Sequence, residues 1–208
     1  MKKLTLLCIV ALFMTLFHSC TKNNYYCSNC CTTEVDANGL TADVHNILSD
    51  SLLLIIKNLG MPINGGANPP ALQGTYLVSK LELTNSNISS DVPGTNFADF
   101  RITFKNQNTT NLTVDIDYVN GPELGNGIKS YVVGDGKNFT VFAEISGSTN
   151  SQPFKNVYTL SGTMEDDGIH NFKSALTMTN DFGDPLNQYI SIGDTRVFKD
   201  NDGFSPKQ

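Results

Sequence analysis

Alternation of apolar and polar residues beyond residue 72 is the sequence feature that most constrains the fold. The segment Ala98–Phe104 (ADFRITF) has an apolar residue at every second position, and Leu112–Tyr118 (LTVDIDY) repeats the pattern. Successive side chains of a β-strand point to opposite faces of a sheet, so each segment has one apolar face and one polar face. The pattern therefore predicts strands whose apolar side lies against a core.

Further segments of this region are also predicted to be strands: Tyr76–Leu83, Lys129–Val133, Phe139–Ile145, Asn156–Gly162, Ile169–Met178 and Gln188–Phe198. Short breaks rich in Asn, Asp and Gly, such as Gly134–Gly136 and Glu165–Gly168, predict hairpins between them. About eight antiparallel strands joined in this way form either an up-and-down β-barrel or a β-sandwich. The barrel is the main prediction, because a meander of about eight strands closes naturally and removes its edges. The β-sandwich is the alternative.

Residues 40–60 are predicted to form one helix, so the expected fold is mainly β with one N-terminal α-helix. Thr41 is a suitable N-cap, and Gly60 ends the pattern. Apolar residues recur at spacings of three and four and form one stripe: Val44, Leu48, Leu52, Ile55, Ile56 and Leu59. We expect this stripe to pack against the β-domain or to close one end of it, and a partner-binding helix is the alternative. Residues 61–71, rich in Gly, Asn and Pro, are expected to be a linker.

Residues 1–19 have the organisation of a secretory signal peptide. Two lysines precede the apolar run Leu4–Phe17, and a small residue precedes Cys20. The run has about 14 residues, whereas a helix needs about 20 to span a bilayer. We therefore predict an export signal rather than a permanent membrane span. Residues 20–39 are largely polar and are expected to be a tether.

Two motifs resemble known families. The end of the signal is similar to a relaxed lipobox of bacterial lipoproteins, which implies a lipid on the thiol of Cys20 and attachment to a membrane through that lipid. Leu72–Tyr76 (LQGTY) resembles the Gly-x-Trp opening of the first lipocalin strand, with Tyr76 in place of Trp. Arg196 stands in the last strand, where lipocalins often place an Arg over that aromatic. The chain thus resembles an exported lipoprotein of the Bacteroidetes, with a lipocalin-like β-domain over residues 72–199 and a C-terminal tail over 200–208.

The same resemblance suggests a location. In Bacteroidetes lipoproteins, a run of acidic residues after the lipidated cysteine directs the protein to the cell surface, and Thr21–Asn24 contains no acidic residue. This implies an outer-membrane lipoprotein of the cell envelope that faces the periplasm rather than the surface. The formal net charge is −6, and loss of the two signal lysines makes it more negative. We expect no nucleic-acid partner, because phosphate binding requires clustered Lys and Arg. No motif of the sequence indicates a particular protein partner.

The sequence contains no reaction signature, so no catalytic residue, cofactor or metal site is predicted. Cys27, Cys30 and Cys31 are expected to form a local disulfide or to stay free. Half of a zinc knuckle is an alternative that lacks a second ligand pair, and a redox Cys-x-x-Cys is one that lacks a βαβ unit. Asp115 and Asp117 share one strand face as an acid–base pair would, but a half-exposed sheet explains them equally well.

Seven aromatic residues on the predicted strands are expected to face the barrel interior and line a ligand cavity: Tyr76, Phe100, Phe104, Tyr118, Phe139, Phe142 and Tyr158. A lipid anchor combined with a closed β-meander predicts a non-enzymatic lipoprotein that binds a small apolar ligand. The same aromatic residues would equally fill a solid core. The alternative function is an envelope interaction or glycan-binding module, which a sandwich would favour.

Overall fold

A computed structural model describes residues 33–208 of the chain. The predicted signal peptide and the residues Cys20, Cys27, Cys30 and Cys31 lie outside the described residues. Two short helices, α1 (Ala42–Ile47) and α2 (Asp50–Asn58), precede the strands. Within residues 33–208, no helix is long and apolar enough to cross a membrane.

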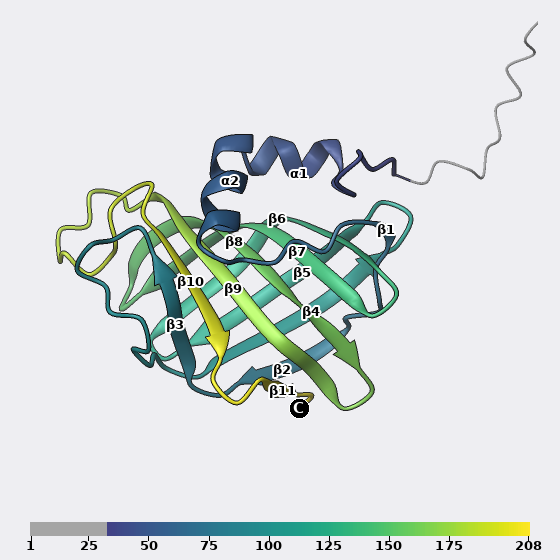
Figure 1. Cartoon of the computed structure of the whole chain (residues 1–208). Coiled ribbons are helices and arrows are strands. Elements are labelled where there is room, and N and C mark those ends of the chain that lie inside the picture. The colour runs from purple at the N-terminus through teal and green to yellow at the C-terminus, as the bar shows by residue number, and fades with distance from the viewer. Residues whose placement is uncertain (1–32) are drawn as a thin grey trace, which may run out of the picture. The chain divides into compact units, whose positions relative to one another are not determined.

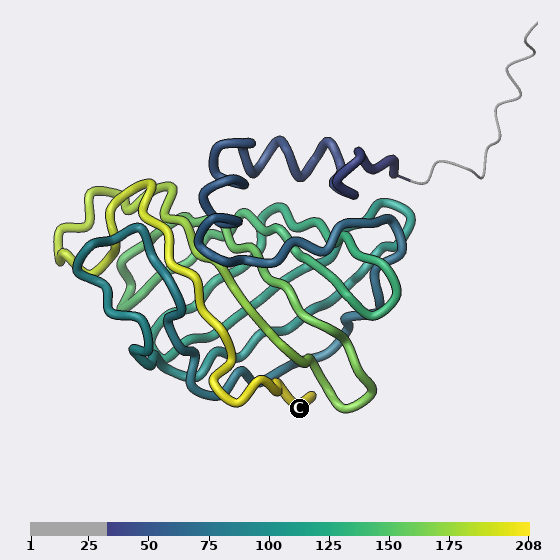
Figure 2. Tube along the Cα trace, viewed as in Figure 1, coloured from purple at the N-terminus to yellow at the C-terminus, as the bar shows by residue number. Residues whose placement is uncertain are grey.

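The rest of the described chain is mainly β. Its strands are β1 Ala67–Asn68, β2 Gly74–Val78, β3 Leu81–Ser86, β4 Phe100–Asn108, β5 Thr113–Asn120, β6 Glu123–Asp135, β7 Asn138–Thr149, β8 Gln152–Glu165, β9 Gly168–Asn180, β10 Thr195–Asp200 and β11 Phe204–Pro206. The main sheet is antiparallel and has the order β2-β4-β5-β6-β7-β8-β9-β10-β3. It curls strongly into a half-barrel (Figure 1). The trace in Figure 2 shows the same curl without the strand arrows.

Hairpins connect the central strands, as the sequence predicts. From β4 to β9 each strand pairs with the next one in the chain. The turns are short: Asp135 pairs with Asn138, and Glu165 pairs with Gly168. All these strands belong to one sheet, so the β-sandwich alternative does not describe this fold.

The two ends of the sheet, β2 and β3, are consecutive in the chain. One strand was expected over Tyr76–Leu83, but the chain bends at Ser79–Lys80, where Lys80 has a φ of 58°. This left-handed conformation interrupts an extended chain. β2 then pairs with β4, while β3 pairs with β10 at the other end of the sheet. The result is an open half-barrel instead of the predicted closed barrel.

The concave face of the sheet encloses the larger of two apolar cores. Aromatic side chains fill much of it, and Phe100 lies among Tyr118, Tyr158 and Phe172 with ring centroids 5.1, 5.8 and 6.2 Å away. The second core lies on the other face of the sheet, which the helices cover (Figure 1). Sheet residues such as Val133 contribute to it together with helix residues.

The predicted helix over residues 40–60 is broken into two. Thr41 caps α1 as predicted, because its side chain accepts a hydrogen bond from the N–H of Val44 at 3.2 Å. Ser49 is a second N-cap, accepting from the N–H of Leu52 at 3.3 Å, and it starts α2. The break shifts the apolar stripe, so Leu53 is buried whereas Ile55 is 37% exposed. The stripe still packs against the β-domain, as expected.

Segments expected to be irregular add two strands to the sheet. In the predicted linker, β1 pairs in parallel with β6. In the predicted tail, β11 pairs with β9, and the N–H of Gln208 donates to the carbonyl of Thr75 at 2.8 Å. The C-terminal segment therefore contacts both β9 and β2, beside the open part of the half-barrel.

Candidate ligand-binding site

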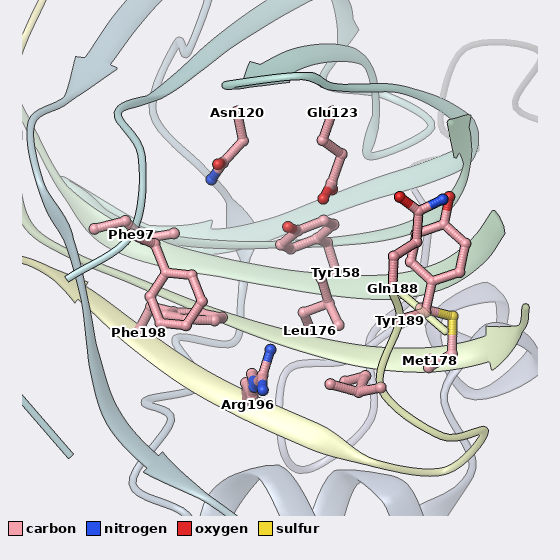
Figure 3. A pocket seen from close by; sticks show the side chains of 12 residues that line it. Phe97, Asn120, Glu123, Tyr158, Leu176, Met178, Gln188, Tyr189, Arg196 and Phe198 are labelled. Carbon is pink, nitrogen blue, oxygen red and sulfur yellow. The ribbon is translucent and has the colours of Figure 1, made fainter. Parts of the chain in front are cut away.

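One end of the half-barrel holds a pocket of about 120 Å³, which we call the mouth pocket (Figure 3). It is partly open to solvent. Its lining comes from the strands at this end and from the loops that connect β3 to β4 and β9 to β10: Leu81, Phe97, Asn120, Glu123, Tyr158, Leu176, Met178, Gln188, Tyr189, Ile190, Arg196 and Phe198.

The β9–β10 loop supplies one wall of the mouth pocket. The sequence predicts a strand from Gln188, but this segment is a loop, and β10 begins only at Thr195. The carboxylate of Asp184 accepts hydrogen bonds from the N–H groups of Gln188 and Tyr189 at 3.0 and 2.8 Å. The Tyr189 hydroxyl donates to the carbonyl of Gln152 and accepts from the N–H of Thr149 at 3.2 Å. These bonds fix the loop on the β7–β8 hairpin.

Glu123 is the main polar group of the pocket. It stands at the first position of β6, and its side chain points into the pocket toward Tyr158 (Figure 3). The hydroxyl of Tyr118 donates a hydrogen bond to Oε1 of Glu123. Burial raises the pKa of Glu123, and the bond from Tyr118 only partly opposes this effect.

The two tyrosines beside Glu123 are neutral hydrogen-bonding groups. Burial raises the pKa of Tyr118 well above its usual value of 10.0, and the neighbouring phenol of Tyr158 and the charge of Glu123 raise it further. Burial and the charge of Glu123 have the same effect on the pKa of Tyr158. Their rings pack edge to face with centroids 5.2 Å apart. This end of the core is therefore a rigid aromatic platform that carries hydroxyl groups.

Arg196 lines the pocket but is engaged by another residue. Its Nε and Nη2 atoms donate to the two carboxylate oxygens of Asp91, each at 2.7 Å. This bidentate bond holds the pKa of Asp91 below its usual range. The guanidinium also lies 5.6 Å from the ring centroid of Phe97. The lipocalin resemblance places this Arg over Tyr76, but Tyr76 packs on Phe104 instead.

Most of the predicted cavity residues fill the core rather than line an open space. Tyr158 lines the mouth pocket. Five others lie in the core of the concave face: Tyr76, Phe100, Phe104, Tyr118 and Phe139. Phe142 belongs to the core on the other face, with the helices, because strand alternation turns it away from its neighbours Val141 and Ala143. The mouth pocket lies at one end of this core and is open enough to admit a ligand.

The other residues singled out from the sequence do not come together as a site. Asp117 pairs with Lys105, which lowers its pKa, and also accepts from Asn126 at 2.7 Å. Asp115 accepts from Asn106 at 2.8 Å, so these two aspartates are separate members of an exposed polar face. No group of three or more metal-binding side chains is present among residues 33–208.

Sequence reasoning missed Glu123, the main polar group of the pocket. It predicted β6 only from Lys129, whereas the strand begins at Glu123. The turn at Gly121–Pro122, directly after a clearly alternating strand, was an available signal for a hairpin there. No pattern marks Glu123 itself, because its partners Tyr118 and Tyr158 come from β5 and β8.

Comparisons with protein-family models, with curated proteins and with solved structures find no significant match to this chain.

Proposed function

We propose that this protein is a lipocalin-like binding protein, not an enzyme, and that the mouth pocket holds a small amphipathic ligand. The observation that carries the proposal is the pocket itself, with apolar and aromatic walls around a few convergent polar groups. Ligand sites in proteins have this composition. The rigid strands behind the pocket suit a preformed site rather than one assembled on binding.

The size of the pocket limits the ligand. A dry cavity of about 150 Å³ is known to admit benzene. The mouth pocket, at about 120 Å³, is somewhat smaller but partly open to solvent, so its upper size limit is a single ring or a short aliphatic chain. Because the pocket is partly open, a longer ligand would leave its remainder in solvent beside the β9–β10 loop.

We also propose the anchored location that the N-terminal motifs imply. A lipid on Cys20 would attach the chain to the outer membrane on its periplasmic side. The first described residue, Thr33, donates its N–H to the carbonyl of Thr110 at 3.0 Å, in the β4–β5 turn. The mouth pocket lies at the other end of β5, where Asn120 and Glu123 line it, so the β4–β5 turn is at the opposite end of these strands. The ligand would then enter from the side remote from the tether.

Ligand binding is tested with the purified protein and ethylbenzene as the probe. Binding to the folded state alone raises the free energy of unfolding, by about 2.7 kcal/mol at a hundredfold excess over Kd. Leu176→Phe fills the pocket and is expected to abolish the stabilisation. Leu54→Phe makes the same exchange on the exposed side of α2, where Leu54 is 59% exposed, and serves as the control. Equal stabilisation of both variants would contradict a site at the mouth.

Anchoring has its own test. In a bacterial host with lipoprotein processing, the wild-type chain is expected to appear in the membrane fraction with the mass of a lipidated fragment that begins at Cys20. Cys20→Ser is expected to lose both the lipid mass and the membrane association. A wild-type chain of unmodified mass would contradict the lipobox interpretation.

A second candidate function is recognition of an envelope protein or a glycan. It is favoured by the filled interior and by exposed apolar residues of the β9–β10 loop: Phe182 is 50%, Leu186 66% and Ile192 59% exposed. Exposed apolar residues grouped on one loop are common in interaction surfaces. If Phe182→Ala abolishes binding to an oligosaccharide panel while Leu176→Phe does not, this second function is the better one.

A further inference from the structure

We infer that the ligand of the mouth pocket is a small primary amine, whose ammonium group binds Glu123 and whose apolar part lies against the aromatic walls. This inference rests on the proposed function and names the chemical class of its ligand. It follows from the charges, the hydrogen-bonding deficit and the walls of the pocket.

The charges of the pocket leave one negative group without a partner. The positive charge of Arg196 is matched by Asp91 through two bonds of 2.7 Å. Glu123 has no Lys, Arg or His within ion-pair distance among the described residues. The pocket therefore carries a net charge of about −1 whenever Glu123 is ionised, which attracts cations and repels carboxylate ligands.

The pocket lacks a hydrogen-bond donor for one of its acceptor atoms. Tyr118 satisfies Oε1 of Glu123, while Oε2 has no hydrogen-bond partner within residues 33–208. This oxygen is an acceptor, and the carboxylate that carries it points into the pocket (Figure 3). A primary ammonium brings three donors and no acceptor, so it fits this arrangement better than an alcohol or an acid.

A cation would also relieve the burial of the carboxylate. Burial raises the pKa of Glu123, since the charged form is separated from water. An ammonium in contact would stabilise the ionised form and lower that pKa. The aromatic walls formed by Phe97, Tyr158 and Phe198 accept the apolar part of the ligand, and their ring faces are compatible with a cation.

The test is a series of single-ring probes of nearly equal size, titrated calorimetrically into the purified full chain: 2-phenylethylamine, 2-phenylethanol and phenylacetate. A charge-assisted hydrogen bond in a partly buried site is expected to make the amine bind about tenfold to a hundredfold more tightly than the alcohol. Phenylacetate is expected to bind most weakly. Glu123→Gln is expected to remove the preference for the amine while leaving the affinity for the alcohol within about twofold.

Glu34→Gln is the matched control, because it removes one exposed carboxylate far from the pocket and is expected to keep the preference. Equal affinity of the wild-type protein for amine and alcohol, or tighter binding of phenylacetate, would overturn the inference and leave the proposed function standing. If none of the three probes and no ethylbenzene binds, the proposed function fails as well. The wild-type comparison needs no variant, so it is decisive even if Glu123→Gln does not fold.

Discussion

The variant Asp200→Asn tests how a buried carboxylate at the end of β10 affects the pH dependence of the free energy of unfolding. Asp200 is 2% exposed, and its Oδ2 accepts a hydrogen bond from the Ser205 hydroxyl at 2.6 Å. Its Oδ1 has no partner among the described residues. Burial raises the pKa of Asp200 from 3.8 to about 6, and the carboxylate of Asp202 adds to this effect. The folded protein therefore holds this proton more tightly than the unfolded chain does.

The sign and size of the effect follow from this shift. A carboxyl group whose pKa is raised on folding stabilises the folded state at low pH. Its contribution to the free energy of unfolding is lost as the pH rises from about 4 through about 6. This difference between 3.8 and about 6 corresponds to about 3 kcal/mol if it is fully expressed. Solvent in the hollow beside the turn, which Asp200 and Lys199 line, screens the charge and reduces the expected loss to about 1–2 kcal/mol.

The assay is urea unfolding followed by far-UV circular dichroism at several pH values, since the chain has no Trp for fluorescence. The amide keeps the size of the side chain, and its own effect on stability is the same at every pH. The difference in free energy of unfolding between Asp200→Asn and the wild type is therefore expected to shift by about 1–2 kcal/mol in favour of the variant as the pH rises from about 4 to about 7. Asp166→Asn, on the exposed β8–β9 turn, is the control for loss of one charge. Parallel curves for Asp200→Asn and the wild type would refute the reasoning.

Three further predictions concern the core and the pocket rim. Phe100→Ala is expected to lower the free energy of unfolding by about 3–5 kcal/mol in urea, because the ring is 1% exposed and packs on three others; a loss below about 1 kcal/mol would contradict this packing. Gly125→Ala is expected to lower it by about 1–3 kcal/mol and to change the near-UV spectrum, because the new Cβ would overlap the ring of Tyr118; an unchanged spectrum would show that the ring has room. Arg196→Lys loses the bidentate bond to Asp91, which lies in the β3–β4 loop. Amide hydrogen exchange in this loop is therefore expected to accelerate. Unchanged exchange would mean that the Arg196–Asp91 pair does not hold the loop.

Much of the fold follows from local sequence patterns. Alternation in Ala98–Phe104 and Leu112–Tyr118 locates β4 and β5 to within a few residues, because strand periodicity is visible wherever one face is polar. The predicted strand at Tyr76–Leu83 failed because nothing local marks Lys80 as a residue with positive φ. The helix prediction failed in a similar way at Ser49, whose capping bond is as local as that of Thr41 but lies within an unbroken apolar stripe.

The candidate site was far less predictable than the fold. Aromatic residues were correctly placed in the β-domain, yet alternation does not tell a residue that fills a core, such as Phe100, from one that borders a hollow, such as Tyr158. Glu123 and Arg196 are 73 positions apart in the chain, and Arg196 depends on Asp91, which lies 105 positions before it. Tyr118 is only five residues before Glu123, but the second neighbouring tyrosine, Tyr158, comes from β8.

The sequence alone determined that this chain forms hairpin-linked antiparallel strands preceded by an apolar helical segment, because periodicity and turn residues act over a few neighbouring positions. Only the tertiary structure decided that the sheet stays open between β2 and β3, and that Phe142 faces the helices while its neighbours face the concave core. It also decided that aromatic side chains pack much of the concave face, and that the mouth pocket at its end holds Glu123 with no ion-pair partner in the described chain. The physical reason is that the curvature of the sheet, the filling of its core and the pairing of its charges depend on contacts between residues distant in the chain. Local sequence patterns contain no information about such contacts.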